Sequence, residues 1–535
     1  MTASDALGPE ATEGGDGGSP AVPSSRESAP VSIRHTPAGA RVAPRGLGQC
    51  EAEPSPIDAM IARQLAAPMT RRQFVARAVT LAVSASALGA ALEACAQAAR
   101  PSATPSATPS PGPAITPGPT FGGTPPVIDP LPTTATYGAM LEASALGPAA
   151  VPSAALRALL DEVAADAGIP VALAVADGRR QARLTVTADD PSFASQAYRL
   201  EVAPTTDGPA VTVRAGDEAG AYNGLLSLAR LVVTDGPTRW LRAATVDDAP
   251  GFARRGAILD PYVLPDIGVT DASRALLLER VRFGVRHKLN FLDLVDRPPW
   301  PELVRYCGEH HVELLKAIGG RAYLVDWWPD EDRRRIDEVL DAGTRTIAFC
   351  FDDIPTTNPE ALASQHATVF RDLYGYVRGR NPDVRVSAVL PPYGGIPGRN
   401  LVFSKQGEGE RYLAVMRDEL PADVRVFWTG DGGVFSATVT TAGARAYADA
   451  VGHELRLWDN DAIRFSTDRQ PCSGRAPDLS SVVHTYMGNL VTGDPWHGTN
   501  GEFALLTSLL YTWNPSTYDP AAAATTAERI LASGS

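Results

Sequence analysis

The second half of the chain alternates short apolar stretches with longer ones whose apolar residues recur at helical spacing. This alternation is typical of strand–helix units that build a parallel sheet. The apolar stretches, which we expect to form strands, are 254–260, 289–295, 312–319, 344–352, 384–392, 424–430, 455–460 and 484–491. Amphipathic stretches such as 272–288 and 358–380 lie between them, and a last helix is expected near 503–514. The pattern predicts an α/β fold with a (β/α)8 barrel over residues 251–520.

A smaller α/β domain is predicted in front of the barrel, over residues 147–250. Residues 152–168 carry apolar side chains at helical spacing, and 182–189 and 196–204 alternate apolar and polar positions as strands do. A strand, a glycine-containing turn and a second amphipathic helix follow over 210–232. No group of chemically reactive side chains is evident in this domain, so we expect the chemistry in the barrel.

Residues 69–95 have the features of a targeting segment. They contain a twin arginine, Arg71-Arg72, then a short Ala-rich apolar stretch and a box that ends at Cys95. This arrangement is similar to a bacterial twin-arginine export signal closed by a lipoprotein processing site. We therefore expect export to the extracellular space or cell surface, with Cys95 as the lipidation site and the lipid as the only link to a membrane.

The remaining parts of the chain are predicted to be linkers. Residues 1–68 form a Gly/Pro/Ser-rich leader that is either disordered or untranslated, if translation begins at Met69. Residues 96–146 form a tether too rich in Pro, Ser and Thr to pack. Residues 521–535 are interpreted as a C-terminal tail.

Composition narrows the class of partner. The 535 residues are 44% hydrophobic and 20% charged with a net charge of −13, so no basic surface for nucleic acid is indicated. Cys307, Cys350 and Cys472 are the cysteines of the folded region, and they show no CxxC spacing. His310 and His311 are neighbours that point different ways on a helix. We predict neither a metal site nor a disulfide framework, and no cofactor.

Two adjacent carboxylates, Asp352 and Asp353, end the apolar run 347–351. One interpretation is structural, because Asp is common in turns and at helix N-caps. The other is functional, because barrel enzymes carry their chemistry where the strands end. Further polar and aromatic residues fall at predicted strand ends: Asp260, Asp293, Asp296, Tyr393, Trp428, Thr429, Trp458, Asp459 and Asn460. Aromatic rings cover the apolar faces of a sugar, and acids and amides bind its hydroxyls.

The two carboxylates need not share one task, since successive residues of a strand point to different sides. Close like charges also push two pKa values apart, which leaves one group ionised and the other protonated near neutrality. Most retaining glycosidases take their two carboxyl groups from separate places about 5 Å apart. An adjacent pair suits the substrate-assisted exception, in which the 2-acetamido oxygen of the sugar attacks the anomeric carbon.

Four barrel motifs occur in the order expected of a known enzyme family. They are AFCFDDI (348–354), FWTG (427–430), LWDN (457–460) and LLYTWNPSTYDP (509–520). They resemble the barrel of glycoside hydrolase family 84, the β-N-acetylglucosaminidases that include O-GlcNAcase and hyaluronidase-like enzymes. The segment 147–250, with its join PGFARRG, resembles the small α/β domain that precedes the barrel in that family and in hexosaminidases.

This resemblance implies roles for individual residues. Asp352 would polarise the acetamide, and Asp353 would act as general acid and base. The implied substrate-binding residues are Tyr393, Thr429, Trp458 and Asn460. The implied reaction is hydrolysis of β-linked N-acetylglucosaminides, or related N-acetylhexosaminides, with retention and substrate assistance.

The chain also departs from the family pattern. Leu259 and Asp260 stand where the family has a Glu and a sugar-contacting Gly, and Arg297 replaces a Lys, exchanging a point donor for a planar fork. We keep Asp260 and Arg297 as candidate substrate-binding residues. An Asp expected after the W-x-N motif falls on Phe465, and a later Asn falls near Gly493.

Two principal readings of the function remain open at this stage. The first is a glycosidase whose altered pocket changes its selectivity among sugars. The second is a surface lipoprotein that binds glycans and has little or no activity. The presence of both Asp352 and Asp353, which a binder would not need, favours the enzyme. A metal-dependent barrel hydrolase is a third, weaker alternative.

Overall fold

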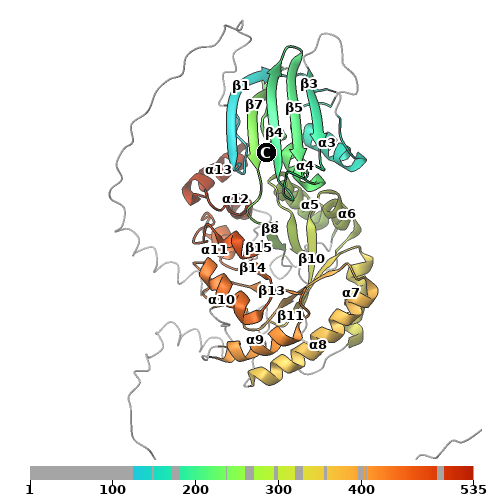
Figure 1. Ribbon diagram of the computed structural model, residues 1–535, viewed down its shortest axis with the longest axis vertical. Helices are drawn as coiled ribbons and strands as arrows, with labels where there is room; N and C mark the ends of the chain where they lie inside the picture. The colour runs from blue at the N-terminus through green and yellow to red at the C-terminus, as the bar shows by residue number, and fades with distance from the viewer. Residues whose placement is uncertain are drawn as a thin grey trace, which may run out of the picture. The chain divides into compact units, whose positions relative to one another are not determined.

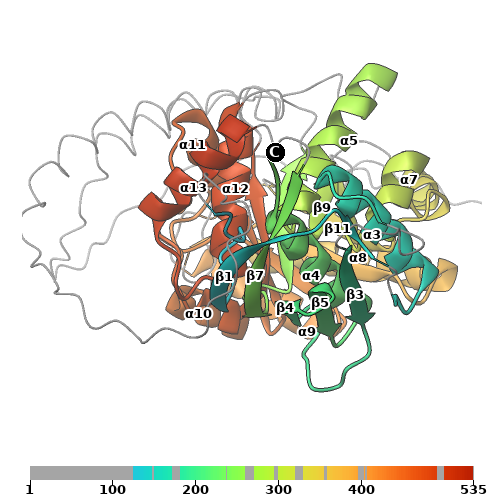
Figure 2. The same cartoon turned by 90° about the horizontal axis from the view of Figure 1, so that it is seen from above.

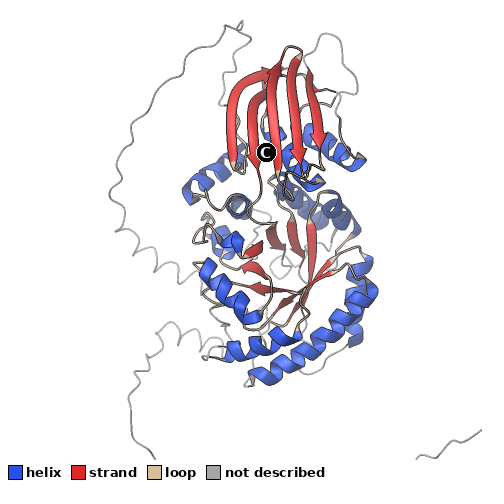
Figure 3. Cartoon of the chain, in the orientation of Figure 1, coloured by secondary structure: helices blue, strands red, loops and turns tan. Residues whose placement is uncertain are grey.

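A computed structural model describes most of the chain from residue 125 onward (Figures 1 and 3). The described residues are 125–147, 150–171, 181–235, 238–259, 270–294, 299–319, 329–352, 354, 358–395, 403, 407–490 and 499–533. The twin arginine and Cys95 lie outside these ranges, as do three of the candidate site residues, Asp260, Arg297 and Asp353. No helix within the described ranges is long and apolar enough to cross a membrane.

The N-terminal domain is a mixed sheet against which two helices pack (Figures 1 and 2). Its strands run in the order β1-β7-β4-β5-β3-β2, and β6 pairs with β7. The strands are β1 (Thr134–Glu142), β2 (Ala145–Leu146), β3 (Gln181–Thr187), β4 (Tyr198–Thr205), β5 (Gly208–Ala215), β6 (Val232–Asp235) and β7 (Thr238–Asp248). The helices are α3 (Ala154–Asp166) and α4 (Glu218–Arg230), which contact each other, and α4 contacts β4 and β5.

The sheet begins earlier in the chain than the sequence indicates. Strand β1 starts at Thr134, inside the segment 96–146 that we interpret as a tether. Its residues are mostly exposed or half-buried, because it lies at the sheet edge and pairs only with β7. An edge strand without a buried stripe, next to a Pro-rich stretch, has no periodicity by which to recognise it.

The barrel is closed by eight parallel strands, which confirms the predicted fold class. The strands are β8 (Arg254–Leu259), β9 (Phe291–Leu294), β10 (Glu313–Gly319), β11 (Thr346–Cys350), β12 (Arg385–Val389), β13 (Arg425–Trp428), β14 (Leu455–Asp459) and β15 (Val483–Asn489). Each lies within a predicted strand or differs from it by one residue at an end. Strands that follow each other in the chain pair with each other, with a register shift between β14 and β15, and β15 closes on β8.

Helices surround the barrel strands (Figure 3). They are α5 (Asp271–Arg286), α6 (Pro301–Glu309), α7 (Pro329–Asp341), α8 (Pro359–Arg380), α9 (Glu408–Glu419), α10 (Thr441–Val451), α11 (Ala462–Thr467), the 3-10 helix η3 (Leu479–Ser481), α12 (Thr499–Trp513) and α13 (Pro520–Ser533). Helix α13 occupies the stretch 521–535 that the sequence suggests is a tail. It packs on α12 and buries Ala527 and Ile530.

Side chains alternate between the barrel interior and the helical layer, as the pleat requires. On β11, Ala348 and Cys350 belong to the interior cluster, whereas Ile347, Phe349 and Phe351 belong to the core shared with the helices. Interior residues of the other strands include Ile258, Phe291, Leu315, Val389, Phe427, Trp458 and Met487. The interior is therefore a packed core, and a residue that continues this alternation past the end of its strand, as Asp352 does after β11, reaches the carboxyl-terminal rim.

A charged cluster closes the opposite, amino-terminal end of the barrel. Glu313 at the start of β10 accepts hydrogen bonds from Arg254 at 2.6 Å and Arg456 at 3.0 Å, and it pairs with Arg385 at 3.0 Å. Burial opposes ionisation of Glu313, but the three arginines outweigh it and lower the pKa of this carboxyl to about 2. One carboxylate thereby ties together the starts of four strands.

A second buried network joins the N-terminal domain to the barrel. Asp248, the last residue of β7, accepts hydrogen bonds from Tyr198 at 2.7 Å, Lys288 at 3.2 Å and the indole of Trp513 at 3.0 Å. Burial lowers the pKa of Lys288 to about 8, although the Asp248 carboxylate opposes this shift. The four side chains come from β4, β7, the turn after α5 and the end of α12.

Candidate active site

Four neighbouring barrel strands, β11 to β14, bring the described candidate residues to one rim. Asp352 is half-buried and follows the end of β11, where Ala348 and Cys350 point into the barrel interior. Tyr393 follows β12, Thr429 follows β13, and Trp458 and Asn460 lie at the end of β14. The amide of Thr429 donates to the carbonyl of Tyr393 over 2.9 Å, and the rings of Trp458 and Phe427 meet edge to face at 5.7 Å. The alternation rule thus places these residues together.

A glycine-rich loop after β13 forms part of this rim. The Thr429 hydroxyl donates to the carbonyl of Gly433, and the Gly395 amide donates to the carbonyl of Gly430 over 2.9 Å. Gly430 and Gly433 have φ of +101° and +92°, which L side chains rarely adopt. A Cβ on Gly394 would lie 2.3 Å from the Gly433 carbonyl oxygen. Glycine at these positions lets the loops after β12 and β13 lie backbone against backbone.

Asn489, at the end of β15, is a rim residue that the motifs do not single out. Its Nδ2 donates to Oδ1 of Asn460 over 2.7 Å, while Nδ2 of Asn460 donates to the carbonyl of Val434 over 2.8 Å. Oδ1 of Asn489 and Nε1 of Trp458 are buried, and neither has a hydrogen-bond partner within the described ranges. An acceptor and a donor left over at one rim can bind hydroxyl groups. The signal in the sequence is the inward alternation through 485, 487 and 489.

Two of the other carboxylates at strand ends do not belong to this rim group. Asp293 on β9 is fully buried in the barrel, level with Ile258 and Leu315 of the neighbouring strands. Asp459 accepts two hydrogen bonds from Arg475, at 2.6 and 2.8 Å, and one from Tyr486 at 2.7 Å. The part of the chain that is described contains no group of His, Cys, Asp and Glu able to hold a metal ion.

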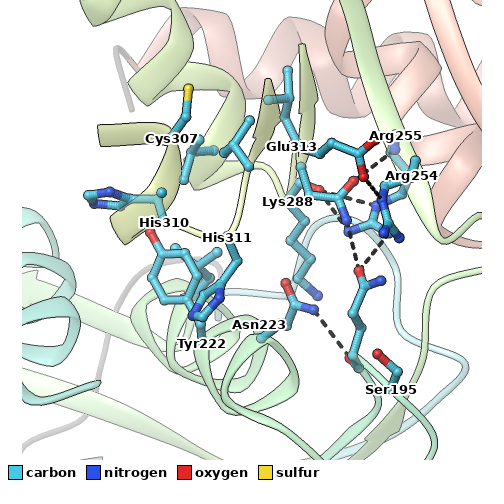
Figure 4. Close-up of a pocket in the computed structure, with 18 of the residues that line it drawn as sticks. Ser195, Tyr222, Asn223, Arg254, Arg255, Lys288, Cys307, His310, His311 and Glu313 are labelled. Carbon is cyan, nitrogen blue, oxygen red and sulfur yellow. Dashed lines mark hydrogen bonds and ion pairs between the residues drawn. The ribbon is translucent and has the colours of Figure 1, made fainter. Parts of the chain in front are cut away.

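A cavity of about 320 Å³ lies at the other end of the barrel, next to α4 (Figure 4). Its wall includes Arg254, Asn290 and Glu313, which mark the starts of barrel strands, and also His310 and His311. Its buried cations are partnered, since Lys288 binds Asp248 and Arg255 donates to main-chain carbonyls. We assign this cavity to the join between the domains.

His310 and His311 pack against neighbouring aromatic and acidic side chains. His310 stacks on Tyr306 at 3.8 Å, and its Nε2 lies 2.9 Å from the carboxylate of Glu162. His311 has a φ of +56° and lies beside Tyr222. Both are therefore part of the packing between α4, α6 and α3.

Two family models match consecutive parts of this chain. Residues 302–534 match the family model for β-N-acetylglucosaminidase, and residues 130–249 match that for glycosyl hydrolase family 20, domain 2. The first match includes all described candidate side chains and starts after Arg297. Both models describe glycosyl hydrolases, so the chain is a glycosidase of the hexosaminidase type.

Solved structures share the fold at low sequence identity. The structure of CpGH84B is 19% identical with a TM-score of 0.58, covering 76% of this chain and 74% of its own. An inactive mutant of the family 20 exo-β-N-acetylglucosaminidase from Vibrio harveyi is 10% identical with a TM-score of 0.53, covering 80% and 79%. The chitobiase of Flavobacterium johnsoniae is 12% identical with a TM-score of 0.51, covering 75% and 71%.

Proposed function

We propose that this glycosidase hydrolyses β-linked N-acetylglucosaminides, or related N-acetylhexosaminides, with retention, as a divergent relative of glycoside hydrolase family 84. The observation that carries the proposal is the position of Asp352. Asp352 continues the inward-facing positions of β11, Ala348 and Cys350, to the carboxyl-terminal rim. A second carboxylate follows it in the sequence, and both lie within the segment that matches the β-N-acetylglucosaminidase model. The natural substrate would be a glycan or glycoconjugate that carries N-acetylhexosamine.

In the proposed first step, the Asp352 carboxylate accepts a hydrogen bond from the acetamido N–H of the sugar. The acetamido oxygen then attacks the anomeric carbon while Asp353 protonates the departing glycosidic oxygen. The bond to the leaving group breaks as the bond to the acetamido oxygen forms, which gives an oxazoline-type ring. The carboxylate of Asp352 stabilises the positive charge that develops on the acetamido nitrogen.

In the second step, Asp353, now ionised, takes a proton from a water molecule that attacks the anomeric carbon. The ring opens, the acetamide is restored, and Asp353 is protonated again. Each step inverts the anomeric centre, so the product keeps the β configuration. The ring of Trp458 would cover an apolar face of the sugar, and Tyr393, Thr429 and Asn460 would line its acetamide and hydroxyl side.

Release of a fluorogenic leaving group from β-GlcNAc and β-GalNAc glycosides tests the proposal directly. The wild-type protein is expected to turn over at least one of them, with the β-anomer of the free sugar as the first product by NMR. The alternative role is that of a surface glycan-binding protein on the same fold. Binding on a glycan array without turnover of either substrate would favour that role and contradict the hydrolase.

Asp352→Ala is expected to lower kcat for the 2-acetamido substrate by about 100-fold, because it removes the charge that stabilises the transition state. The measurement compares acetamido and 2-hydroxy glycosides with the same leaving group. The ratio of their rates should fall, since the 2-hydroxy sugar has no group for Asp352 to hold. A wild-type enzyme that hydrolyses the 2-hydroxy glycoside as fast as the acetamido one would contradict substrate assistance.

Asn489→Ala is expected to raise KM about 10-fold with little change in kcat, because its amide contributes to sugar binding in the ground and transition states alike. Asn381→Ala is the matched control, since it removes an amide that follows α8 before β12 begins, away from the rim. Steady-state kinetics on one fluorogenic glycoside gives both constants. An unchanged KM in folded Asn489→Ala would remove Asn489 from the site.

A further inference from the structure

A buried ion pair lies directly behind the rim, outside the group of residues assigned to the sugar. The guanidinium of Arg475 and the carboxylate of Asp459 are joined by two hydrogen bonds, at 2.6 and 2.8 Å. Their side chains are 1% and 0% exposed. Tyr486 donates a third hydrogen bond to Asp459 at 2.7 Å, and the Arg475 guanidinium lies 4.8 Å from the ring centre of Phe465. A two-point pair of this kind fixes orientation as well as distance.

The Arg475–Asp459 pair holds the backbone at the end of β14, where the proposed sugar-binding residues Trp458 and Asn460 lie. Asp459 stands between Trp458 and Asn460 in the sequence, so its side chain points away from the barrel interior. Its Oδ1 also accepts the main-chain N–H of Asp461 over 3.1 Å. Asp459 therefore holds the chain on both sides of Asn460 and sets the direction in which Trp458 and Asn460 leave the strand.

The remaining donors of Arg475 extend the connection to the neighbouring rim loop. The guanidinium donates to the carbonyls of Ser436 at 3.3 Å and Ala437 at 3.2 Å, and to that of Ser473. This is the loop whose Val434 carbonyl receives the Asn460 amide. A single side chain thus holds the end of β14, the loop after β13 and its own segment before β15.

Gly474, next to Arg475, lets its loop lie close to the loop after β13. Gly474 has a φ of +72°, and a Cβ there would lie 2.1 Å from the carbonyl oxygen of Ala437. The Val439 amide donates to Gly474, and the Ala476 amide donates to Val439, each over 2.9 Å. The two loops thereby form a short bridge that carries Arg475 to the strand end.

We propose that Arg475, acting through Asp459, is a positioning residue that sets the sugar-binding geometry of Trp458 and Asn460. This inference rests on the proposed function. Phe465 belongs to the same support, because it is fully buried under the guanidinium. Phe465 stands where the family resemblance implies an Asp. In this chain its ring instead packs against Arg475.

The test is Arg475→Lys, which keeps the charge but replaces the planar fork by a point donor. Because Trp458 and Asn460 bind the sugar in the ground and transition states, their displacement acts mainly on KM. We expect KM for the β-GlcNAc glycoside, and the inhibition constant of free N-acetylglucosamine, to rise about 10-fold or more while kcat stays within about three-fold. Arg475→Met should have a larger effect of the same kind.

The matched control is Lys288→Arg, a conservative exchange in a second buried ion pair, Lys288–Asp248, which lies at the domain join. Both exchanges are expected to lower Tm, but only Arg475→Lys should raise KM. Wild-type KM in folded Arg475→Lys, or an equal rise in Lys288→Arg, would overturn the positioning role. Failure of the proposed function is seen separately, as a wild-type protein without turnover.

In that case calorimetry measures the Kd of N-acetylglucosamine for the wild type, Arg475→Lys and Lys288→Arg, and only Arg475→Lys should raise it. Absence of binding to the wild type contradicts both proposals.

Discussion

Asp353→Asn is expected to lower kcat/KM for a β-N-acetylglucosaminide with a sugar or alkyl leaving group by about 10²–10⁴-fold, because the amide cannot give a proton to the glycosidic oxygen. The loss should depend on the leaving group. An aryl leaving group of low pKa departs without protonation, so its first step should be much less affected. Kinetics on a series of glycosides with leaving groups of graded pKa measures this dependence.

The control for Asp353→Asn is Asp372→Asn, a half-buried carboxylate on α8 that pairs with Arg333 and should leave the kinetics unchanged. If the loss were equal for all leaving groups, Asp353 would not be the acid. Full activity of Asp353→Asn would remove the residue from the catalytic pair.

The second large effect is on stability. Asp248→Ala is expected to lower the free energy of unfolding by about 3–5 kcal/mol, because it leaves the buried Lys288 without its counter-ion. It also removes the acceptor shared by Tyr198 and Trp513. Chemical denaturation followed by circular dichroism gives the difference.

The neighbouring residue supplies the control. Asp247 forms an ion pair with Arg199, and both side chains are more than two-fifths exposed. Asp247→Ala should cost about 1 kcal/mol or less, as exposed pairs contribute little. An equal loss of unfolding free energy in the two variants would show that the Asp248 network does not stabilise the junction between the domains.

The barrel strands could be predicted well because each is a short apolar run between amphipathic helices. Ile347, Phe349 and Phe351 face the helices while Ala348 and Cys350 face the interior, so both faces are apolar and the run stands out. Strand β1 gives no such signal, since its partner β7 lies about a hundred residues away and one edge is unpaired. Helix α13 lies in the stretch that we interpret as a tail, although its run of alanines, the residue with the highest helix propensity, favours a helix.

The part of the candidate site that lies directly at strand ends could be predicted from the sequence. Asp352, Tyr393, Thr429, Trp458 and Asn460 follow from that rule together with the family resemblance. Their catalytic and binding roles remain predictions, as do those of Asp260, Arg297 and Asp353, which lie outside the described residues. The pairing of Asn489 with Asn460 and of Arg475 with Asp459 depends on which loops meet at the rim. Neither contact is local in sequence, so periodicity and motifs do not reveal it.

The hydrogen bond between Asp248 and Trp513 also constrains the order of events during synthesis. The two residues are 265 positions apart in the chain. The N-terminal domain can form its own sheet early, but the acceptor on its last strand has no Trp513 donor until α12 has left the ribosome, 265 residues later. Until then Lys288 and Asp248 lack the cover of the Trp513 ring. A nascent chain stopped inside the barrel would therefore expose an incomplete charged junction, and the two domains become one folded unit only after α12 has been synthesised.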